Sequence, residues 1–104
     1  MTDTGRRAQQ RFDIEIPVEL TIEGRVLTTT TRNISLGGLF LNLTEPVPFG
    51  STVGLKFELP DLDHPVEVEG HVRWVQPDVG LGVQFAGVRA KVVWALQRLI
   101  ADHG

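Results

Sequence analysis

The feature that most constrains the fold is a strictly alternating stretch near the N-terminus. Apolar residues occupy every second position of the stretch 12–23, and the positions between them are mostly charged. The apolar members are Phe12, Ile14, Ile16, Val18, Leu20 and Ile22. A period of two is typical of a β-strand with one face toward the core and the other toward water. Pro17 lies within this stretch and cannot donate to a strand ladder, so the pattern predicts an edge strand or a bulge there.

The rest of the first 85 residues predicts five more short strands separated by turns. Residues 25–32 are rich in β-branched side chains and include four consecutive threonines, which favours a strand. Four further stretches have alternating or clustered apolar residues between turn-forming segments. They span 39–43, 53–59, 66–74 and 81–85. Gly70 lies in register with the apolar residues of its strand, which predicts a bulge or a close backbone approach.

The C-terminal part has a different period. From Val88 to Ile100 there is no glycine or proline, and apolar residues recur at spacings of three and four. This predicts an amphipathic helix over about 88–101. The whole pattern indicates a fold dominated by β-structure: a small six-stranded antiparallel β-barrel with one C-terminal α-helix. Residues 12–104 would form the barrel and helix, and residues 1–11 a flexible basic arm.

Length and composition exclude several classes of protein. The 104 residues suit one domain, and no apolar run is long enough to predict a membrane span. Cysteine is absent, which excludes a disulfide scaffold, cysteine-ligated zinc and thiol catalysis. The first residues are polar and lack a signal-peptide core, so a cytoplasmic protein is expected. A net charge of −3 and an aromatic content of 7% argue against binding of nucleic acid.

Positive charge gathers at the N-terminal end of this acidic chain. Arg6, Arg7 and Arg11 precede the first predicted strand, so the core does not require them. The guanidinium group offers a rigid fork of donors that matches phosphate oxygens and the edge of guanine. Three arginines within six residues point to a compact polyanionic ligand, with a solvated basic tail as the alternative.

The second candidate segment is Asn33-Ile34-Ser35-Leu36-Gly37-Gly38. Asparagine and serine bind local backbone groups in tight turns, and glycine allows positive φ, which gives the segment a purely structural interpretation. Alternatively, an amide and a hydroxyl two residues apart can hydrogen-bond a base edge, and glycines let the backbone approach a flat ligand. The segment fits neither a nucleophile elbow nor a phosphate-binding P-loop.

Together, the two segments resemble those of the PilZ domain, the bacterial receptor module for cyclic di-GMP. Residues 6–11 fit the pattern Arg-Arg-x-x-x-Arg, and residues 33–38 fit Asp/Asn-x-Ser-x-x-Gly. Residues 81–85 look like the Gly-x-x-Phe strand that commonly closes that domain. The resemblance covers nearly the whole chain, with both motifs in order and about twenty residues apart.

The resemblance implies a ligand that lies across one face of the barrel and is clamped by the N-terminal arginine segment. By position, Arg7 and Arg11 match the two arginines that hold phosphates and guanine. Arg6 matches the preceding residue, which influences whether one nucleotide or an intercalated pair is bound. The positions matched to residues that meet a guanine are Asn33, Ser35 and Gly38.

Three further residues are weaker candidates for ligand contact, namely Gly37, Arg32 and Trp74. Trp74 lies in a predicted strand, where it either stacks on a base or belongs to the barrel core or rim. The acidic residues and histidine of the loop 60–65 fit turn polarity better than a metal site, and no metal or other cofactor is expected. No pair of carboxylates lies in apolar surroundings as a tuned acid and base would, so no enzyme is expected.

The sequence therefore predicts a non-catalytic cyclic di-GMP receptor that relays the signal to an unidentified partner protein. Motility, surface attachment, polysaccharide export and transcription are all compatible outputs. The alternative is an interaction adaptor of the same fold that acts without the nucleotide. Neither nucleic acid nor a membrane span is expected, and the chain would be a monomer or a weak dimer.

Overall fold

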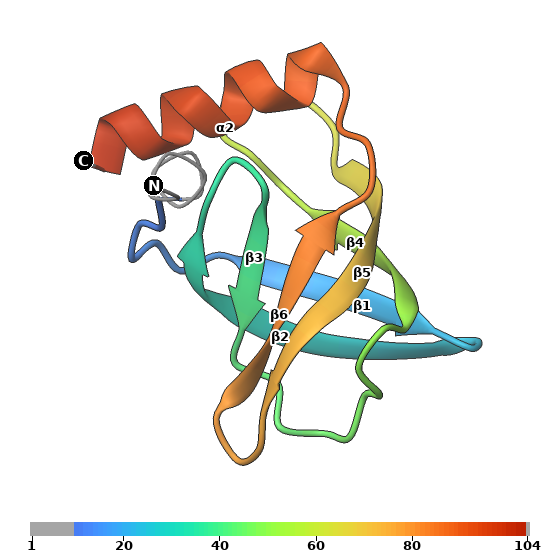
Figure 1. Cartoon of the computed structure of the whole chain (residues 1–104). Helices are drawn as coiled ribbons and strands as arrows, with labels where there is room; N and C mark the ends of the chain where they lie inside the picture. Colours follow the sequence, from blue (N-terminus) through green and yellow to red (C-terminus); the bar gives the residue numbers. More distant parts are fainter. Residues whose placement is uncertain (1–9, 104) are drawn as a thin grey trace, which may run out of the picture.

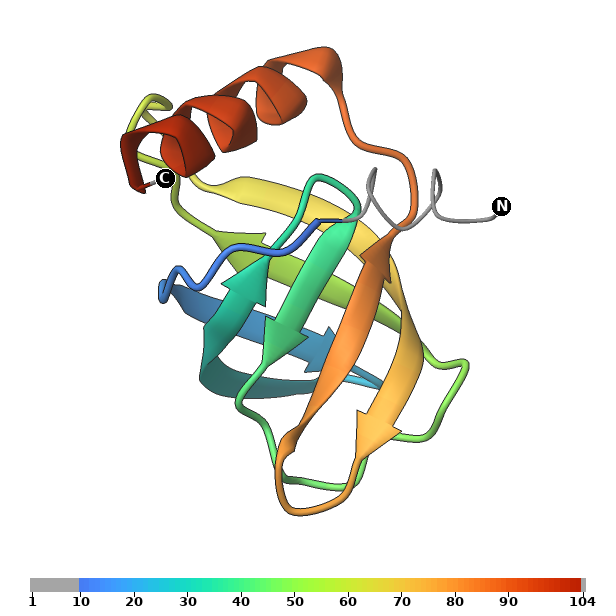
Figure 2. The same ribbon diagram turned by 60° about the vertical axis from the view of Figure 1, so that its left-hand side comes forward.

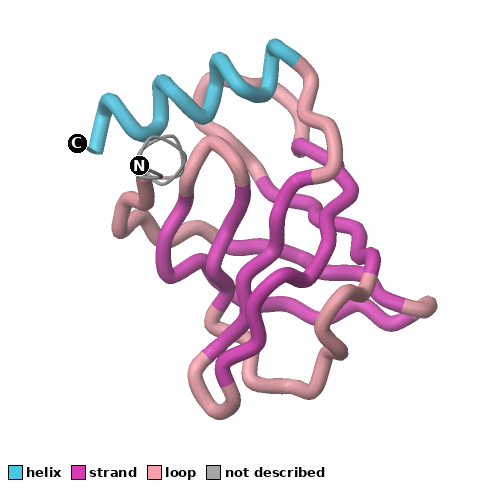
Figure 3. Tube along the Cα trace, in the orientation of Figure 1, coloured by secondary structure: helices cyan, strands magenta, loops and turns pink. Residues whose placement is uncertain are grey.

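The computed structural model describes residues 10–103. The described part contains six strands and one helix, which carry the labels of Figure 1. The strands are β1 (Pro17–Ile22), β2 (Arg25–Ile34), β3 (Gly38–Leu41), β4 (Thr52–Phe57), β5 (Val66–Gln76) and β6 (Gly80–Phe85), and the helix is α2 (Ala90–His103). The longest loops connect β3 to β4 and β4 to β5 (Figure 3).

The six strands close into one barrel in the order β1-β2-β3-β6-β5-β4. All neighbouring pairs are antiparallel. β1 pairs with β2 on one side and with β4 on the other, which closes the ring. The predicted fold, a six-stranded antiparallel barrel with one C-terminal helix, is therefore confirmed.

The barrel interior is filled by the apolar half of each alternating strand. In β1, Val18, Leu20 and Ile22 are at most 6% exposed, whereas the residues between them are exposed. β4 buries Val53 and Leu55 in the same way. Each such aliphatic side chain contributes about 1.5–3 kcal/mol when fully buried. Burial of the apolar residues at every second position therefore stabilises the barrel.

Helix α2 packs across one end of the barrel (Figures 1 and 2). It buries Ala95, Leu96 and Leu99, which form one stripe of its surface. Among its exposed residues, the guanidinium of Arg98 lies 5.6 Å from the ring centroid of Trp94, and Arg98 Nε donates to Asp61 Oδ2 in the loop between β4 and β5 at 3.1 Å. Within residues 10–103, no helix has both the length and the apolar character that a membrane crossing needs.

The helix lies two residues further along the chain than the predicted range 88–101. Gly87 has a φ of 86°, and the carbonyl of Arg89 accepts the N–H groups of Val92 and Val93. The first helical turn therefore forms only after this glycine, although the apolar spacing already begins at Val88.

The strand predicted over 12–23 is shorter than its alternation suggested. β1 begins at Pro17, and the preceding residues form an irregular segment joined to β2 by a bridge between Phe12 and Ile34. The N–H of Ile14 bonds to the carbonyl of Phe12 instead of to a neighbouring strand. Ile14 is nevertheless 3% exposed. Here the alternating apolar residues predict which side chains are buried, although the backbone does not form the regular hydrogen bonds of a strand.

The interpretation of Gly70 is resolved in favour of a close backbone approach. A Cβ at this position would lie 3.0 Å from the backbone carbonyl oxygen of Gln84 and 2.5 Å from Val83 Cγ1, both in β6. The bulge of β5 lies elsewhere, between Val72 and Trp74. The predicted arm of residues 1–11 lies outside the described residues, apart from its last two positions.

Candidate functional site

The N-terminal segment and the end of β2 are joined by two of the predicted site residues. Arg11 Nη1 donates to Asn33 Oδ1 at 2.9 Å, which links positions 22 residues apart in the sequence. The neighbouring residues Phe12 and Ile34 exchange both backbone hydrogen bonds, at 2.8 and 2.9 Å. Figure 2 shows the blue segment running past the ends of β2 and β3 before it enters β1. The fold thus brings one residue of each sequence motif into direct contact.

Arg11 also lines a cleft of about 360 Å³ beside the β5–β6 hairpin. The lining residues are Arg11, Gly37, Gly38, Arg73, Trp74, Gly82, Val83 and Gln84. Among these described lining residues two are arginines and none is acidic, so the cleft attracts anions. Trp74 is 59% exposed and adds an aromatic face. A concave site with aromatic surface and a few charged donors suits a small ligand.

A β-bulge explains why two consecutive residues of β5 line the same cleft. In a regular strand, neighbouring side chains point to opposite faces. The register of β5 against β6 shifts between Val72 and Trp74, which leaves Arg73 as the extra residue. Such a bulge re-aims side chains. Arg73 Nε donates to Gln84 Oε1 at 3.0 Å, and this bond holds the guanidinium beside the cleft.

Sequence reasoning missed Arg73 and Gln84. They lie in predicted strands, and strand alternation alone gives no indication of a bulge. The one available signal is that an arginine stands next to the candidate residue Trp74. The structure places Trp74 on the surface instead of in the core.

Ser35 lies in the turn between β2 and β3 and is fully buried, with 0% exposure. Its Oγ accepts the N–H groups of Gly37 and Gly38 at 3.1 Å each and donates to the carbonyl of Gly38 at 3.3 Å. The backbone N–H of Ser35 donates to that same carbonyl at 2.9 Å. All these bonds stay within the turn, so in this structure the Ser35 hydroxyl fixes the shape of the turn.

The glycines of the turn have a packing role as well as a place at the cleft. A Cβ at Gly38 would collide with the carbonyl oxygen of Val83, because β3 and β6 approach closely there. The carbonyl of Gly37 accepts the N–H of Phe85 at 2.9 Å. The barrel therefore requires glycine at position 38 whether or not a ligand is bound.

The remaining predicted site residues lie elsewhere. Arg32 is exposed at the register shift between Thr31 and Asn33, and it is not among the described residues that line the cleft. Arg6 and Arg7 lie outside the described residues. The structure thus brings together Arg11, Asn33, the turn of residues 35–38 and Trp74, and leaves Arg32 apart.

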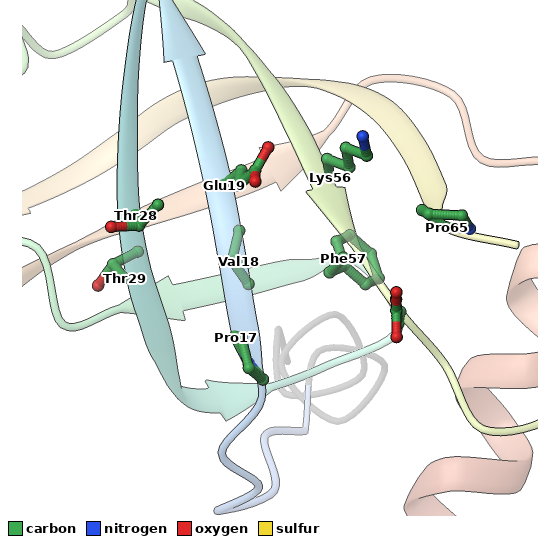
Figure 4. A pocket seen from close by; sticks show the side chains of 9 residues that line it. Pro17, Val18, Glu19, Thr28, Thr29, Lys56, Phe57 and Pro65 are labelled. Carbon is green, nitrogen blue, oxygen red and sulfur yellow. The ribbon is translucent and has the colours of Figure 1, made fainter.

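A second cavity, of about 390 Å³, lies on the wall built by β1, β2 and β4 (Figure 4). Its lining residues are Pro17, Val18, Glu19, Thr28, Thr29, Lys56, Phe57, Glu58 and Pro65. It shares no residue with the cleft at Arg11. Two carboxylates, Glu19 and Glu58, face one cation, Lys56. This balance of charge disfavours the anionic ligand that the cleft attracts.

Solved structures share this fold. One is the Inhibitor of motility (MotI/DgrA) of Bacillus subtilis, which is 24% identical with a TM-score of 0.73 over 93% of this chain and 50% of that chain. This chain therefore spans about half the length of that protein. Another is the PilZ domain of CeSA from a cellulose-synthesizing bacterium, 18% identical with a TM-score of 0.67 over 89% of this chain and 96% of that domain.

A third similar structure is the PlzA protein of Borreliella burgdorferi in complex with c-di-GMP. It is 13% identical, with a TM-score of 0.65 over 96% of this chain and 38% of that chain. At these identities the likeness establishes the fold. No curated protein matches the sequence. The model of the PilZ domain family matches residues 5–102, nearly the whole barrel and helix, and the chain therefore belongs to the PilZ domain family.

Proposed function

We propose that this chain is a non-catalytic receptor for cyclic di-GMP, which binds in the cleft at Arg11. The observation that carries the proposal is the bond between Arg11 and Asn33, because it sets the two motif segments beside one cleft. The ligand has two negatively charged phosphates and two guanines. Arginine provides charge-assisted bonds to the phosphates, and Trp74 provides a face for stacking. Membership of the PilZ family supports this class of ligand.

Arg11 and Arg73, the two arginines that line the cleft, would provide the charged donors to the ligand. In the free chain, Arg11 bonds to a neutral amide oxygen of Asn33. An oxygen of a phosphate or a guanine would replace that partner. The bond from Arg11 to a charged phosphate oxygen would be shorter and stronger than the bond to the amide. The released Asn33 amide is then free for a guanine edge. Arg6 and Arg7 add further positive charge from the same segment, with Arg7 matched to the second clamping arginine.

The turn residues contribute by shape. The Ser35 hydroxyl holds the turn through its bonds to the backbone of Gly37 and Gly38. We infer that these glycines, which have no side chains, leave room in the cleft for a flat base. Arg32 does not line the cleft, so it would act only through its positive charge and not by contacting the ligand.

Calorimetric titration of the purified chain tests the proposal. We expect saturable binding of cyclic di-GMP at concentrations on the order of tens of micromolar or below. Cyclic di-AMP is the matched control, because it keeps both phosphates and lacks the guanine edges, and it should bind more weakly. Heat with neither nucleotide, or equal heat with both, would refute guanine recognition in this cleft.

Replacement of Trp74 by alanine should lower the affinity for cyclic di-GMP by about fivefold to thirtyfold, since stacking of one base contributes about 1–2 kcal/mol. The matched control is Trp94→Ala on α2, which removes a tryptophan that is 48% exposed and does not line the cleft. Calorimetric titration of both variants with cyclic di-GMP measures whether the loss of affinity is specific to Trp74. An equal loss in both would show that the Trp74 ring does not contact the ligand.

We further propose that the receptor acts on a partner protein. Motility is the output to test first, because one protein of the same fold is named an inhibitor of motility. Capture of a motility protein by the tagged chain should depend on added cyclic di-GMP. Capture that is unchanged by the nucleotide would favour an adaptor of the same fold that acts without it.

A further inference from the structure

The irregular segment before β1 meets β2 with one residue too many. Phe12 pairs with Ile34, and the carbonyl of Ile16 accepts the N–H of Thr31 at 2.9 Å. The stretch 12–16 therefore lies against the shorter stretch 31–34. A surplus residue of this kind takes backbone groups out of the regular ladder. The two groups affected here are the carbonyl of Ile14 and the N–H of Ile16, and each of them bonds to a side chain.

That side chain is Thr31 in both cases. Its Oγ1 donates to the carbonyl of Ile14 at 2.6 Å and accepts the N–H of Ile16 at 2.9 Å. Thr31 is 0% exposed, so water does not reach the hydroxyl. A hydroxyl donates and accepts at one atom, which a methyl group of the same size cannot do. Without it, one buried and one partly buried backbone group would lose their partners.

Thr31 stands between the residues that follow Arg11 and the end of β2 that carries Asn33. Arg11 directly precedes the segment that the hydroxyl holds, and Asn33 follows Thr31 by two residues on β2. The segment is held to β2 at both of its ends: the Thr31 hydroxyl bonds to Ile14 and Ile16, and Phe12 forms the bridge to Ile34. Arg11 is thereby held where it reaches Asn33.

We propose that the Thr31 hydroxyl is a clip that positions Arg11 beside the cleft. Thr31 is a positioning residue, which acts through the backbone of residues 14–16 and does not touch the ligand. The inference rests on the proposed function for the identity of its ligand, whereas the clip itself belongs to the ligand-free chain. When the clip is open, a smaller fraction of molecules holds Arg11 ready, and the apparent affinity falls by that fraction.

The first test compares Thr31→Val with Thr31→Ser by amide hydrogen exchange of the ligand-free chain. Valine keeps the shape and removes the hydroxyl, whereas serine keeps the hydroxyl. In the valine variant we expect the amides of Phe12, Ile16 and Ile34 to exchange about tenfold faster, with β4, β5 and β6 unchanged. The serine variant should retain protection at those three amides.

The second test is titration with cyclic di-GMP. Thr31→Val should bind about tenfold more weakly than the wild type, and Thr31→Ser should stay close to the wild type. In an Arg11→Ala background, Thr31→Val should have no further effect, because the clip acts through the residue already removed. Additive losses would overturn the proposal, since a general structural defect does not depend on Arg11.

Other outcomes are equally decisive. Unchanged exchange at Phe12 and Ile16 in the valine variant overturns the clip, and so does uniformly faster exchange or failure to fold, which assigns the hydroxyl to the whole barrel. Independently of any variant, the wild-type Thr31 hydroxyl proton should exchange slowly enough to be seen by NMR, and its absence would count against the clip. If the wild type binds no cyclic di-GMP, the proposed function fails while the exchange experiment still tests the clip.

Discussion

Replacing Arg11 by alanine is expected to weaken the binding of cyclic di-GMP by about 10- to 100-fold. A hydrogen bond to a charged group contributes about 1.5–3 kcal/mol, and about 1.4 kcal/mol corresponds to a factor of ten in affinity. The stability of the fold should change little, because the Arg11–Asn33 bond is exposed and Arg11 does not belong to the barrel core. The free energy of unfolding should therefore change by less than about 0.5 kcal/mol.

The matched control is Arg25→Ala. Arg25 is an exposed arginine at the start of β2, and it is not among the residues that line the cleft. Both variants lose one positive charge, so a loss of affinity caused by the change in net charge alone would be shared by both and larger at low salt. Calorimetry at two salt concentrations separates the two effects. Equal losses in the two variants would contradict a direct contact between Arg11 and the ligand.

The substitution Gly38→Ala is expected to lower the free energy of unfolding by about 1–3 kcal/mol, the usual range for overpacking. An added Cβ would collide with the carbonyl oxygen of Val83. That atom belongs to the backbone of β6, so it moves only if the β3–β6 pairing moves with it. Urea unfolding followed by circular dichroism measures the change.

Gly54→Ala in β4 is the control for this loss of stability. A Cβ at Gly54 would meet only Thr21, at 3.7 Å from its Cβ, which is an ordinary van der Waals distance. Its stability should remain near that of the wild type. If Gly38→Ala unfolded like the wild type and lost only nucleotide binding, Gly38 would be a ligand-facing residue and not a packing requirement.

Most of the fold was predictable because strand alternation and burial coincide in a small barrel. Val18, Leu20 and Ile22 follow the period of two and line the core as expected. The same period failed over residues 12–16, where Ile14 is buried although the backbone is irregular. Hydrophobic spacing reports which side chains avoid water. It carries no information on where the backbone hydrogen bonds go, and here they go to the hydroxyl of Thr31.

The candidate site was predictable in part, for a related reason. Arg11 and Asn33 were identified by residue type and spacing, and the barrel then joins them. Arg73 was out of reach, because its place at the cleft depends on a register shift that only the paired strands define. Ser35 belongs to the turn itself in this structure, a role that its short polar side chain fitted from the start.

The exposed indole of Trp74 gives the cleft a built-in optical reporter. The chain has two tryptophans and no tyrosine, so its near-ultraviolet emission comes from Trp74 and Trp94. One ring lines the cleft, and the other lies on α2 beside the guanidinium of Arg98. With Trp94 changed to phenylalanine, the tryptophan fluorescence of the protein would come from Trp74 alone. Binding of a ligand in the cleft could then be followed without an attached label.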